Sequence, residues 1–311
     1  MKKPRQSLSR LFLNQASGPE RDHMRHLQAL HQAGGGRAFM LDDDNLRMMY
    51  LNPQCMQSAM KRDAPDELLC AYSRAVMGFL MFVPQPAYIL LIGLGGGSLV
   101  KYCYRHLPGC RITVLEINAD VIAMRDAFMI PADDERLQII HCDALEHLQQ
   151  HTYQADVVLL DAYDENGLVA ELNTSSFYTL CHRHLLPGGV LVANVWGKPS
   201  ALADMLSRLR SVFARQVYWL RSADSYNLIV YSIKTRTDSQ AVEAKLDDEL
   251  AAQHPALELS QLQSRLLALL NTSAESEDVD DIPALKTSLS TIMVADDNVP
   301  QSYADWKKLV N

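Results

Sequence analysis

The chain lacks a long hydrophobic run. Its longest apolar stretch, residues 75–84, ends in a proline and is far shorter than the roughly 20 residues that a membrane-spanning helix requires. The basic N-terminus holds only a short apolar segment, residues 11–13, whereas a secretory signal needs roughly 7–15 apolar residues. We therefore expect no contact with a membrane and a cytoplasmic location.

Clustered cysteines and an excess of positive charge are also lacking. The six cysteines include no CxxC pair, and neither they nor the ten histidines show the spacing of a metal site. We expect reduced thiols and no bound metal. Acidic residues outnumber basic ones by 37 to 29, and the net charge of −8 argues against a nucleic-acid partner, because binding to phosphates requires positive charge. The remaining composition, with 48% hydrophobic residues, is that of an ordinary globular protein.

The first 86 residues divide into two parts. Residues 1–36 form a polar, basic arm, which we expect to be helical and to contribute little chemistry. Residues 37–86 form a small element in which two apolar segments flank the turn-rich sequence DDDN, a pattern that predicts a β-hairpin. Residues 67–82 predict a helix with Asp66 as its N-cap.

Residues 87–233 alternate short apolar strands with amphipathic helices. The strand-like segments are YILLIG, RITVLEI, LQIIHC, ADVVLLDA and GVLVANVW, and the helices are expected at 98–106, 119–128, 144–151 and 174–184. This alternation indicates a parallel sheet covered on both faces, and QVYWLR and YNLIVYSI follow as an antiparallel hairpin. We predict an α/β protein with a class I methyltransferase-like Rossmann fold, in which the hairpin closes the parallel sheet. Residues 234–311 are predicted to form a helical C-terminal extension.

A glycine-rich turn, GLGGGS, follows the first parallel strand and opens a helix. Its glycines let the backbone approach a ligand closely, and the helix N-terminus offers unpaired N–H groups. In this context the turn predicts a nucleotide site made by Gly93, Gly95, Gly96 and Gly97. Ser98 stands where a dinucleotide fingerprint has its third glycine, which argues against NAD.

Acidic residues follow the next two strands. Glu116 ends the second strand, where a carboxylate can accept both ribose hydroxyls of a nucleoside. Asp143 precedes Ala144 at the start of the next predicted helix. Its carboxylate could accept the exocyclic amine of adenine or cap the helix, and the two roles are compatible. Because ligands bind at the carboxyl ends of parallel strands, the glycine turn and these residues predict an adenosine pocket.

Two carboxylates follow the fourth strand. Asp161 and Asp164 lie three positions apart on either side of Tyr163, and together they can hold an ammonium group. An amine must lose a proton before it attacks, and a nearby carboxylate can accept that proton. This pair therefore predicts the chemical site. Trp196, after the fifth strand, either lines the substrate pocket or lies in the core.

Residues 51–197 resemble the spermidine synthase (aminopropyltransferase) family, especially its bacterial spermidine-synthase-like branch. The matching segments are QSAMKRDAPDEL, RAVMGFLMFVPQP, ILLIGLGGGSL, VLEINADVI, the two aspartates of DAYD, and LLPGGVLVANVWG. The resemblance implies that Asp161 is the catalytic base and that Asp164 holds the amine substrate. It also implies that Gln57 is the substrate-pocket glutamine and that Tyr72 is the active-site tyrosine near the attacked carbon.

For the nucleoside, the resemblance implies that Glu116 binds the ribose and Asp143 the adenine. The implied reaction transfers a 3-aminopropyl group from decarboxylated S-adenosylmethionine to a small-molecule amine such as putrescine. Since the small β domains of the family often mediate dimers, a homodimer is also expected.

The chain departs from the family pattern in three places. Gly96 replaces the aspartate of GGGDGG that binds the aminopropyl ammonium, Ser73 and Arg74 replace His-Glu after the tyrosine, and Glu165 replaces a proline. Loss of a carboxylate and gain of an arginine would favour a donor that keeps its carboxylate, because arginine pairs strongly with carboxylates. An S-adenosylmethionine-dependent methyltransferase is therefore the alternative, unless Arg74 is simply a solvated helix residue. A nucleoside-binding protein without catalysis is a third hypothesis.

Overall fold

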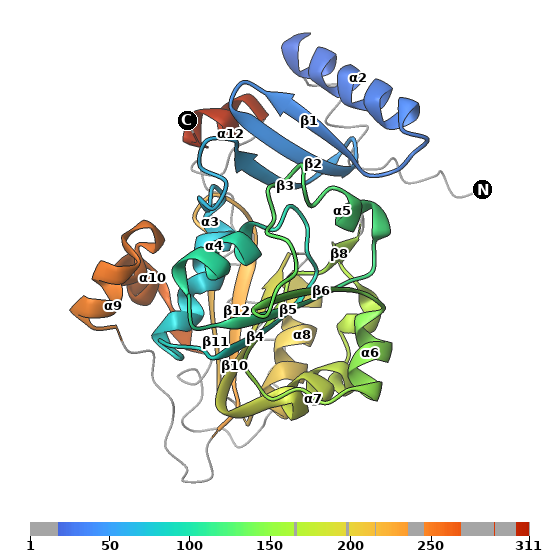
Figure 1. Cartoon of the computed structure of the whole chain (residues 1–311). Helices are drawn as coiled ribbons and strands as arrows, with labels where there is room; N and C mark the ends of the chain where they lie inside the picture. The colour runs from blue at the N-terminus through green and yellow to red at the C-terminus, as the bar shows by residue number, and fades with distance from the viewer. Residues whose placement is uncertain are drawn as a thin grey trace.

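The computed structural model describes residues 18–164, 167–196, 199–214, 216–235, 246–268, 289 and 303–310. A large sheet with helices on both faces fills the lower part of Figure 1, and a small sheet lies above it. Within these ranges, no helix combines the length and the apolar character needed to cross a membrane.

Among the described residues, eight strands form the central sheet, in the order β13-β11-β12-β10-β7-β4-β5-β6. Strands β10, β7, β4, β5 and β6 are parallel neighbours, whereas the pairs β10–β12, β12–β11 and β11–β13 are antiparallel. This order confirms the predicted parallel sheet closed by an antiparallel hairpin. The C-terminal segment adds β13, a strand that the sequence did not indicate. The bounds are β4 (Tyr88–Ile92), β5 (Arg111–Glu116), β6 (Leu137–His141), β7 (Ala155–Leu160), β10 (Leu185–Val195), β11 (Val217–Arg221), β12 (Leu228–Ile233) and β13 (Leu267–Ala268).

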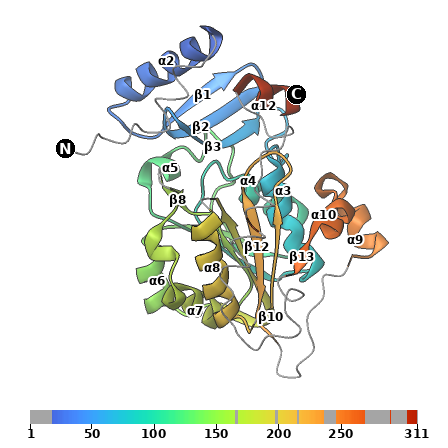
Figure 2. The ribbon, with the colours of Figure 1, turned by 180° about the vertical axis from the view of Figure 1, so that it is seen from behind.

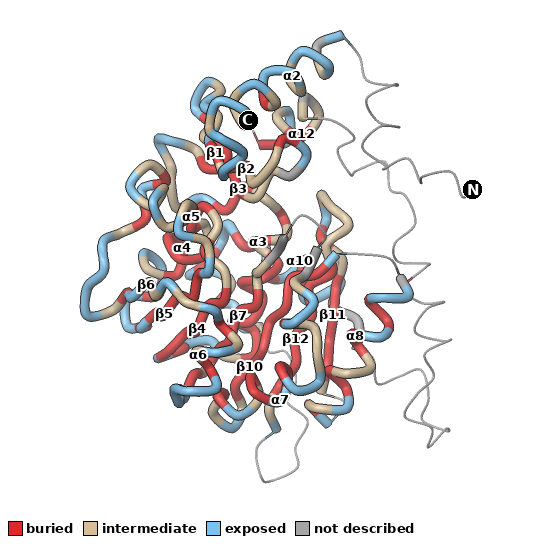
Figure 3. Tube along the Cα trace, turned by 90° about the vertical axis from the view of Figure 1, so that its right-hand side faces the viewer, coloured by how far each residue is buried: buried red, intermediate tan, exposed pale blue. Residues whose placement is uncertain are grey.

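Side chains alternate across the central strands and fill two hydrophobic cores. In β4, Ile89 and Leu91 belong to one core, whereas Tyr88, Leu90 and Ile92 belong to the other. Because both faces are buried, the parallel strands are apolar throughout, and Figure 3 shows them as buried segments in red.

Helices cover both faces of the central sheet (Figures 1 and 2). The first core is covered by α4 (Ser98–His106), α9 (Asp248–Gln253), the 3₁₀ helix η3 (Pro255–Leu257) and α10 (Leu259–Arg265). The second is covered by α6 (Ala144–Gln150), α7 (Ser175–His184) and α8 (Pro199–Val212). Between β7 and α7 lie three short elements: β8 (Tyr163–Asp164), β9 (Gly167–Leu168) and the 3₁₀ helix η2 (Ala170–Leu172).

The small sheet has three antiparallel strands, β1 (Phe39–Asp43), β2 (Leu46–Asn52) and β3 (Cys55–Lys61). The first two form the predicted hairpin. The third strand was not predicted, and it carries Gln57, which the sequence places in the substrate pocket.

Both ends of the described chain pack on this small sheet. The helix α2 (Gly18–Ala33) contributes Leu27 to its hydrophobic cluster, and α12 (Tyr303–Val310) contributes Trp306 and Val310. Figure 2 shows α2 and α12 beside the same sheet. The C-terminal segment is thus partly the helical packing extension that the sequence predicts.

The helix predicted over residues 67–82 begins later. It consists of α3 (Ala71–Val76) followed by the 3₁₀ helix η1 (Met77–Met81). Asp66 does not cap it, because the helix begins at Ala71 and its N-cap is Cys70. The Asp66 carboxylate lies 3.0 and 3.2 Å from side-chain nitrogens of two residues on α4, Arg105 and His106.

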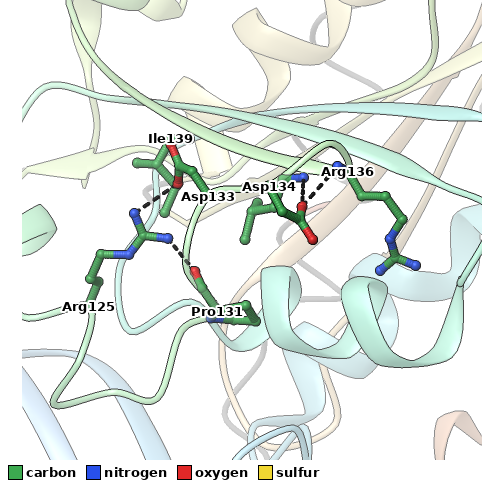
Figure 4. Close-up of polar contacts among 7 residues, drawn as sticks. Arg125, Pro131, Asp133, Asp134, Arg136 and Ile139 are labelled. Atoms are coloured by element: carbon green, nitrogen blue, oxygen red, sulfur yellow. Dashed lines mark hydrogen bonds and ion pairs between the residues drawn. The ribbon is translucent and has the colours of Figure 1, made fainter.

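The helix predicted over residues 119–128 ends early, since α5 covers only Ala119–Ala123. An irregular loop continues to β6, and Figure 4 shows the polar contacts that hold it. Arg125 Nη1 lies 2.8 Å from Asp133 Oδ1, and the same guanidinium donates to the carbonyl oxygen of Pro131. The loop places Phe128 against the glycine turn.

Lys101, on α4, is a buried cation beneath this loop. Its side chain is only 4% exposed, and Nζ donates to the carbonyl oxygen of Phe128 at 2.9 Å and lies 3.0 Å from Met60 Sδ. Burial lowers the pKa of Lys101 to about 8. The lysine therefore joins α4, β3 and the loop, at the cost of burying a charge.

We expect Lys101→Met to change how stability depends on pH. Between the folded pKa of about 8 and the unfolded value of 10.5, the unfolded wild-type chain binds more protons, so its stability rises with pH. From pH 7 to pH 10, the free energy of unfolding of the wild type should therefore gain about 2 kcal/mol relative to Lys101→Met. Urea unfolding at several pH values measures this difference, and parallel curves for the two proteins would contradict it.

Candidate active site

A cavity of about 1300 Å³ opens at the carboxyl ends of the parallel strands and is also lined by residues of β2 and β3. Pockets for one small ligand usually enclose roughly 300–1,000 Å³, so this cavity has room for two substrates. The predicted site residues that line it are Gln57, Tyr72, Gly93, Gly95, Gly96, Glu116, Asp143, Ala144 and Asp161.

The Glu116 carboxylate joins the glycine turn to the end of β5. Oε2 accepts a hydrogen bond from the backbone N–H of Leu94 at 2.7 Å, and Oε1 accepts one from the N–H of Asn118 at 2.7 Å. Each carboxylate oxygen still has a second lone pair. Glu116 can therefore accept a hydrogen bond from a ligand hydroxyl in the cavity while it holds the glycine turn.

Gly93 permits close approach of the ends of β4 and β7. Its φ is +96°, and a Cβ at this position would overlap the carbonyl oxygen of Asp161. The N–H of Asp161 donates to the carbonyl oxygen of Ile92 at 2.9 Å. Glycine at position 93 thus sets Asp161 directly beside the glycine turn.

Gly96 faces a side chain of the small sheet. A Cβ at Gly96 would lie 2.5 Å from Ser58 Oγ, 2.8 Å from Ser58 Cβ and 2.9 Å from Phe128 Cδ1. Ser58 Oγ is also 3.3 Å from Ser98 Oγ, at the start of α4. Ser58 and Phe128 therefore occupy the space that any larger residue at position 96 would need.

Asp143 and Ala144 form the start of α6. Asp143 Oδ1 accepts from the N–H of Glu146 at 2.9 Å, so Asp143 is the N-cap. Both residues also line the cavity. Capping uses one carboxylate oxygen and leaves the other for a ligand donor, so the two roles foreseen for Asp143 are compatible.

Asp161 ends a chain of hydrogen-bonded side chains. Asn194 Nδ2 donates to Asp161 Oδ1 at 2.8 Å, and Asn227 Nδ2 donates to Asn194 Oδ1 at 2.9 Å. Burial raises the pKa of Asp161 above the ordinary aspartate value, and the hydrogen bond from Asn194 offsets part of that rise. A carboxylate with a raised pKa is a stronger base, as proton abstraction requires.

Aromatic and amide side chains line the same cavity as Asp161. Tyr72 comes from α3, Gln57 from β3 and Tyr226 from the loop between β11 and β12, and all three line the cavity. Trp196 also lines it and is 45% exposed, which supports the pocket interpretation rather than the core one. Asp164 belongs to β8, but its side chain lies outside the described residues, so its role stays a prediction.

Two residues singled out in the sequence do not line the cavity. Gly97 is the N-cap of α4, where a Cβ would lie 2.5 Å from Ile130 Cδ1. Arg74 Nη1 donates to the backbone carbonyl oxygens of Leu68 and Leu69 at 2.7 and 3.0 Å. Arg74 therefore holds the segment before α3 and is neither a solvated residue nor part of the cavity wall.

Other lining residues were missed. The arm was expected to contribute little chemistry, yet His31 and Gly36 at its end reach the cavity, as does the adjacent Arg37. Asn194 and Asn227 were missed because each is a single polar residue beside or within an apolar strand. The available signal was an amide within the apolar segment GVLVANVW, since buried amides need partners; Asn194 is indeed only 3% exposed.

The crowding at Gly96 leads to a prediction about donor specificity. Gly96→Asp alone should lower stability by about 1–3 kcal/mol, because its Cβ must displace Ser58 and Phe128. Adding Ser58→Gly should restore most of that loss and let the new carboxylate attract the ammonium of a decarboxylated donor. Thermal unfolding and donor titration measure both effects. Gly109→Asp is the matched control, because a Cβ at Gly109 has nothing within 4 Å; Gly96→Asp as stable as this control would contradict the steric account.

Comparison with known proteins agrees with the resemblance seen in the sequence. Residues 69–243 match the family model of the spermine/spermidine synthase domain. A polyamine aminopropyltransferase of Chromobacterium violaceum is 33% identical over 228 residues, which cover 72% of this chain and 87% of the relative. That of Neisseria meningitidis serogroup A is 33% identical over 204 residues, covering 65% of this chain and 78% of the relative.

Solved structures support the fold. A probable spermidine synthase from Corynebacterium glutamicum is similar with a TM-score of 0.60 at 18% identity, covering 85% of this chain and 94% of that one. Human methyltransferase-like protein 13, in complex with SAH, is similar with a TM-score of 0.51 at 21% identity, and the match covers 66% of this chain and 98% of that one. These likenesses confirm the Rossmann-like methyltransferase fold. The family match over more than half of the chain, together with the identity to curated relatives, shows that this protein belongs to the spermine/spermidine synthase family.

Proposed function

We propose that this protein is an aminopropyltransferase that moves a 3-aminopropyl group from decarboxylated S-adenosylmethionine to a diamine such as putrescine. The products are spermidine and methylthioadenosine. The observation that carries this proposal is that one cavity contains both Glu116 and Asp143, suited to a nucleoside, and Asp161, suited to an amine. The names of the similar curated proteins, polyamine aminopropyltransferase in both cases, agree with this proposal.

The nucleoside end of the cavity accounts for donor binding. Each oxygen of Glu116 accepts one hydrogen bond from a backbone N–H. Its remaining lone pairs accept hydrogen bonds from the ribose hydroxyls. Asp143 accepts the adenine amine, and Ala144 at the start of α6 lies beside it. Gly95 and Gly96 present bare backbone to the donor, which allows close approach.

The amine end accounts for the transfer step. The acceptor amine arrives as an ammonium ion and gives one proton to Asp161. The freed nitrogen lone pair then forms a bond to the carbon of the aminopropyl chain that is attached to the sulfonium sulfur. The carbon–sulfur bond breaks and its electron pair leaves with sulfur, so a neutral thioether is released. Because the sulfonium already activates this carbon, the protein contributes mainly alignment and proton removal. Gln57, Tyr72 and Asp164 hold the amine in line.

The two departures that suggested a methyltransferase do not favour it among the described residues. The argument for an intact donor carboxylate depended on Arg74, whose guanidinium donates to two backbone carbonyls outside the cavity wall. The absence of a carboxylate at Gly96 is explained by the crowding from Ser58. The hypothesis of a binder without catalysis is disfavoured by the place of Asp161, a carboxylate suited to act as a base, in the same cavity as the nucleoside residues.

A donor competition tests the proposal. The purified protein is incubated with equal concentrations of S-adenosylmethionine and its decarboxylated form, together with a panel of diamines, and the nucleoside products are separated by mass spectrometry. We expect methylthioadenosine that appears only when a diamine is present. S-adenosylhomocysteine as the sole product would show a methyltransferase instead.

A homodimer and a cytoplasmic location remain part of the proposal. In the described chain, one face of the small sheet packs against α2 and α12, whereas Met49 and Met60 pack into the first core. A dimer through this domain would therefore use the strand edges or the outer surfaces of these helices.

A further inference from the structure

We propose that Asn227 is a positioning residue for the reaction: it fixes the amide orientation of Asn194, which in turn holds the Asp161 carboxylate in place as the base. This inference rests on the proposed function, because it gives Asp161 the role of the base. Nothing in the sequence motifs pointed to either asparagine.

The hydrogen-bond chain runs across three adjacent strands. Asp161 follows β7, Asn194 lies in β10 and Asn227 immediately precedes β12, and β7, β10 and β12 are neighbours in the sheet. Asn227 Nδ2 donates to Asn194 Oδ1 at 2.9 Å, and Asn194 Nδ2 donates to Asp161 Oδ1 at 2.8 Å. All three residues line the cavity.

Donor and acceptor chemistry allows only one direction for this series of hydrogen bonds. An ionised carboxylate can only accept, so Asn194 must present its NH₂ group to Asp161. Its carbonyl oxygen then points to Asn227, which must donate. The Asp161 carboxylate already favours this orientation of the Asn194 amide, and the donor at position 227 adds a second hydrogen bond that the turned-over amide could not keep. Asn227 therefore reinforces the amide orientation that Asp161 requires.

The same loop also anchors the other side of the amine end. Asp224, in the loop between β11 and β12, accepts from the N–H of Ala71 at 2.7 Å and from the hydroxyl of Ser222 at 2.8 Å. Ala71 starts α3 and directly precedes Tyr72. The loop thus links the start of α3 to the hydrogen-bond chain that ends at Asp161.

Burial is the largest influence on the Asp161 pKa, and the hydrogen bond from Asn194 opposes it. Burial raises the pKa of the Cys70 thiol to about 12, so this neighbour is neutral near pH 8. The Asp224 carboxylate is turned to Ala71 and Ser222, and the Arg221 guanidinium lies over the Tyr226 ring, 5.1 Å from its centroid. The side chain that donates to Asp161 is Asn194.

The test combines an NMR titration with kinetics. The protein is labelled with aspartate carrying ¹³C in the side-chain carboxyl group, and the Asp161 signal is assigned by its loss in Asp161→Asn. Because one hydrogen bond to a charged group is lost, Asn194→Ala should raise the Asp161 pKa by about one unit. Asn227→Ala should raise it in the same direction, by about half a unit. The titration needs no turnover, so it tests this inference even if the proposed reaction is wrong.

Kinetics and a double variant complete the test. Asn227→Ala should lower kcat about tenfold at pH 7, move the acid limb of kcat/KM to higher pH and leave the KM for the donor within about twofold. In the Asn194→Ala background, Asn227→Ala should add nothing, because it acts through Asn194. Gln154→Ala, which removes an exposed amide just before β7 that donates to the carbonyl oxygen of Tyr153 at 3.1 Å, is the control and should behave as the wild type. An unchanged Asp161 pKa in Asn227→Ala, or an equal shift in both backgrounds, would overturn the proposal.

Discussion

Asp161→Asn is expected to lower kcat by about 10³-fold, in the middle of the range that general bases contribute. An asparagine has nearly the same shape and can still accept a hydrogen bond from Asn194, so the fold and the cavity should persist. It cannot take a proton from the attacking ammonium. The loss should therefore appear in kcat, while the affinity for methylthioadenosine changes less than about threefold, because Glu116 and Asp143 remain in place.

The measurement pairs steady-state rates with calorimetric binding of methylthioadenosine. Asp156→Asn is a matched control, since Asp156 lies near the opposite end of β7 and accepts from the N–H groups of Ala87 and Tyr88 at 2.9 Å. That control should lose some stability and keep its kcat. For the wild type, the raised pKa of Asp161 predicts that activity falls as the pH drops through a value above that of an ordinary aspartate. Unchanged turnover in Asp161→Asn would remove it as the base.

Gly93→Ala is expected to have the largest effect on the fold of the site. A residue with a Cβ is strained at φ +96°, and this Cβ would overlap the carbonyl oxygen of Asp161. Backbone strain of this kind costs roughly 1–3 kcal/mol, and overpacking adds about 1–3 kcal/mol. We therefore expect the free energy of unfolding to fall by about 2–6 kcal/mol and activity to be lost as β4 and β7 move apart.

Two other glycines separate strain from crowding. Gly95 has a positive φ of 52° but open space around its Cβ position, and Gly109 has open space without a positive φ. In chemical denaturation, Gly95→Ala should lose about 1 kcal/mol and Gly109→Ala should be neutral or slightly more stable. If Gly93→Ala were no less stable than Gly95→Ala, close approach to Asp161 would not be the reason for glycine at position 93.

The sequence predicted the parallel part of the fold well, because its signals are local. The helix expected at 98–106 matches α4, since a glycine turn begins it and its apolar spacing is regular. The helix expected at 67–82 begins only at Ala71, with Cys70 as its N-cap, and Asp66 instead contacts Arg105 and His106, residues about 40 positions away. No local pattern reveals such a contact. The strand β3 was missed because its polar residues were assigned to a motif rather than to a sheet.

The site was predictable where a residue follows a strand. Glu116, Asp143 and Asp161 were placed together because parallel strands end at one edge, and the structure puts all three in one cavity. Ser58, Asn194 and Asn227 were not predicted. Their roles depend on pairing between β10 and β12 and on the small sheet meeting α4, and these contacts are set by tertiary structure.

The central claim is that this protein transfers an aminopropyl group, and a labelled single turnover tests it most directly. Decarboxylated S-adenosylmethionine carrying deuterium in its aminopropyl chain is mixed with excess enzyme and putrescine, and both products are quantified by mass spectrometry. The account predicts equal amounts of unlabelled methylthioadenosine and spermidine that carries all of the deuterium, with both strongly reduced in Asp161→Asn. Deuterium that stays with the nucleoside, or methylthioadenosine formed without labelled spermidine, would contradict it.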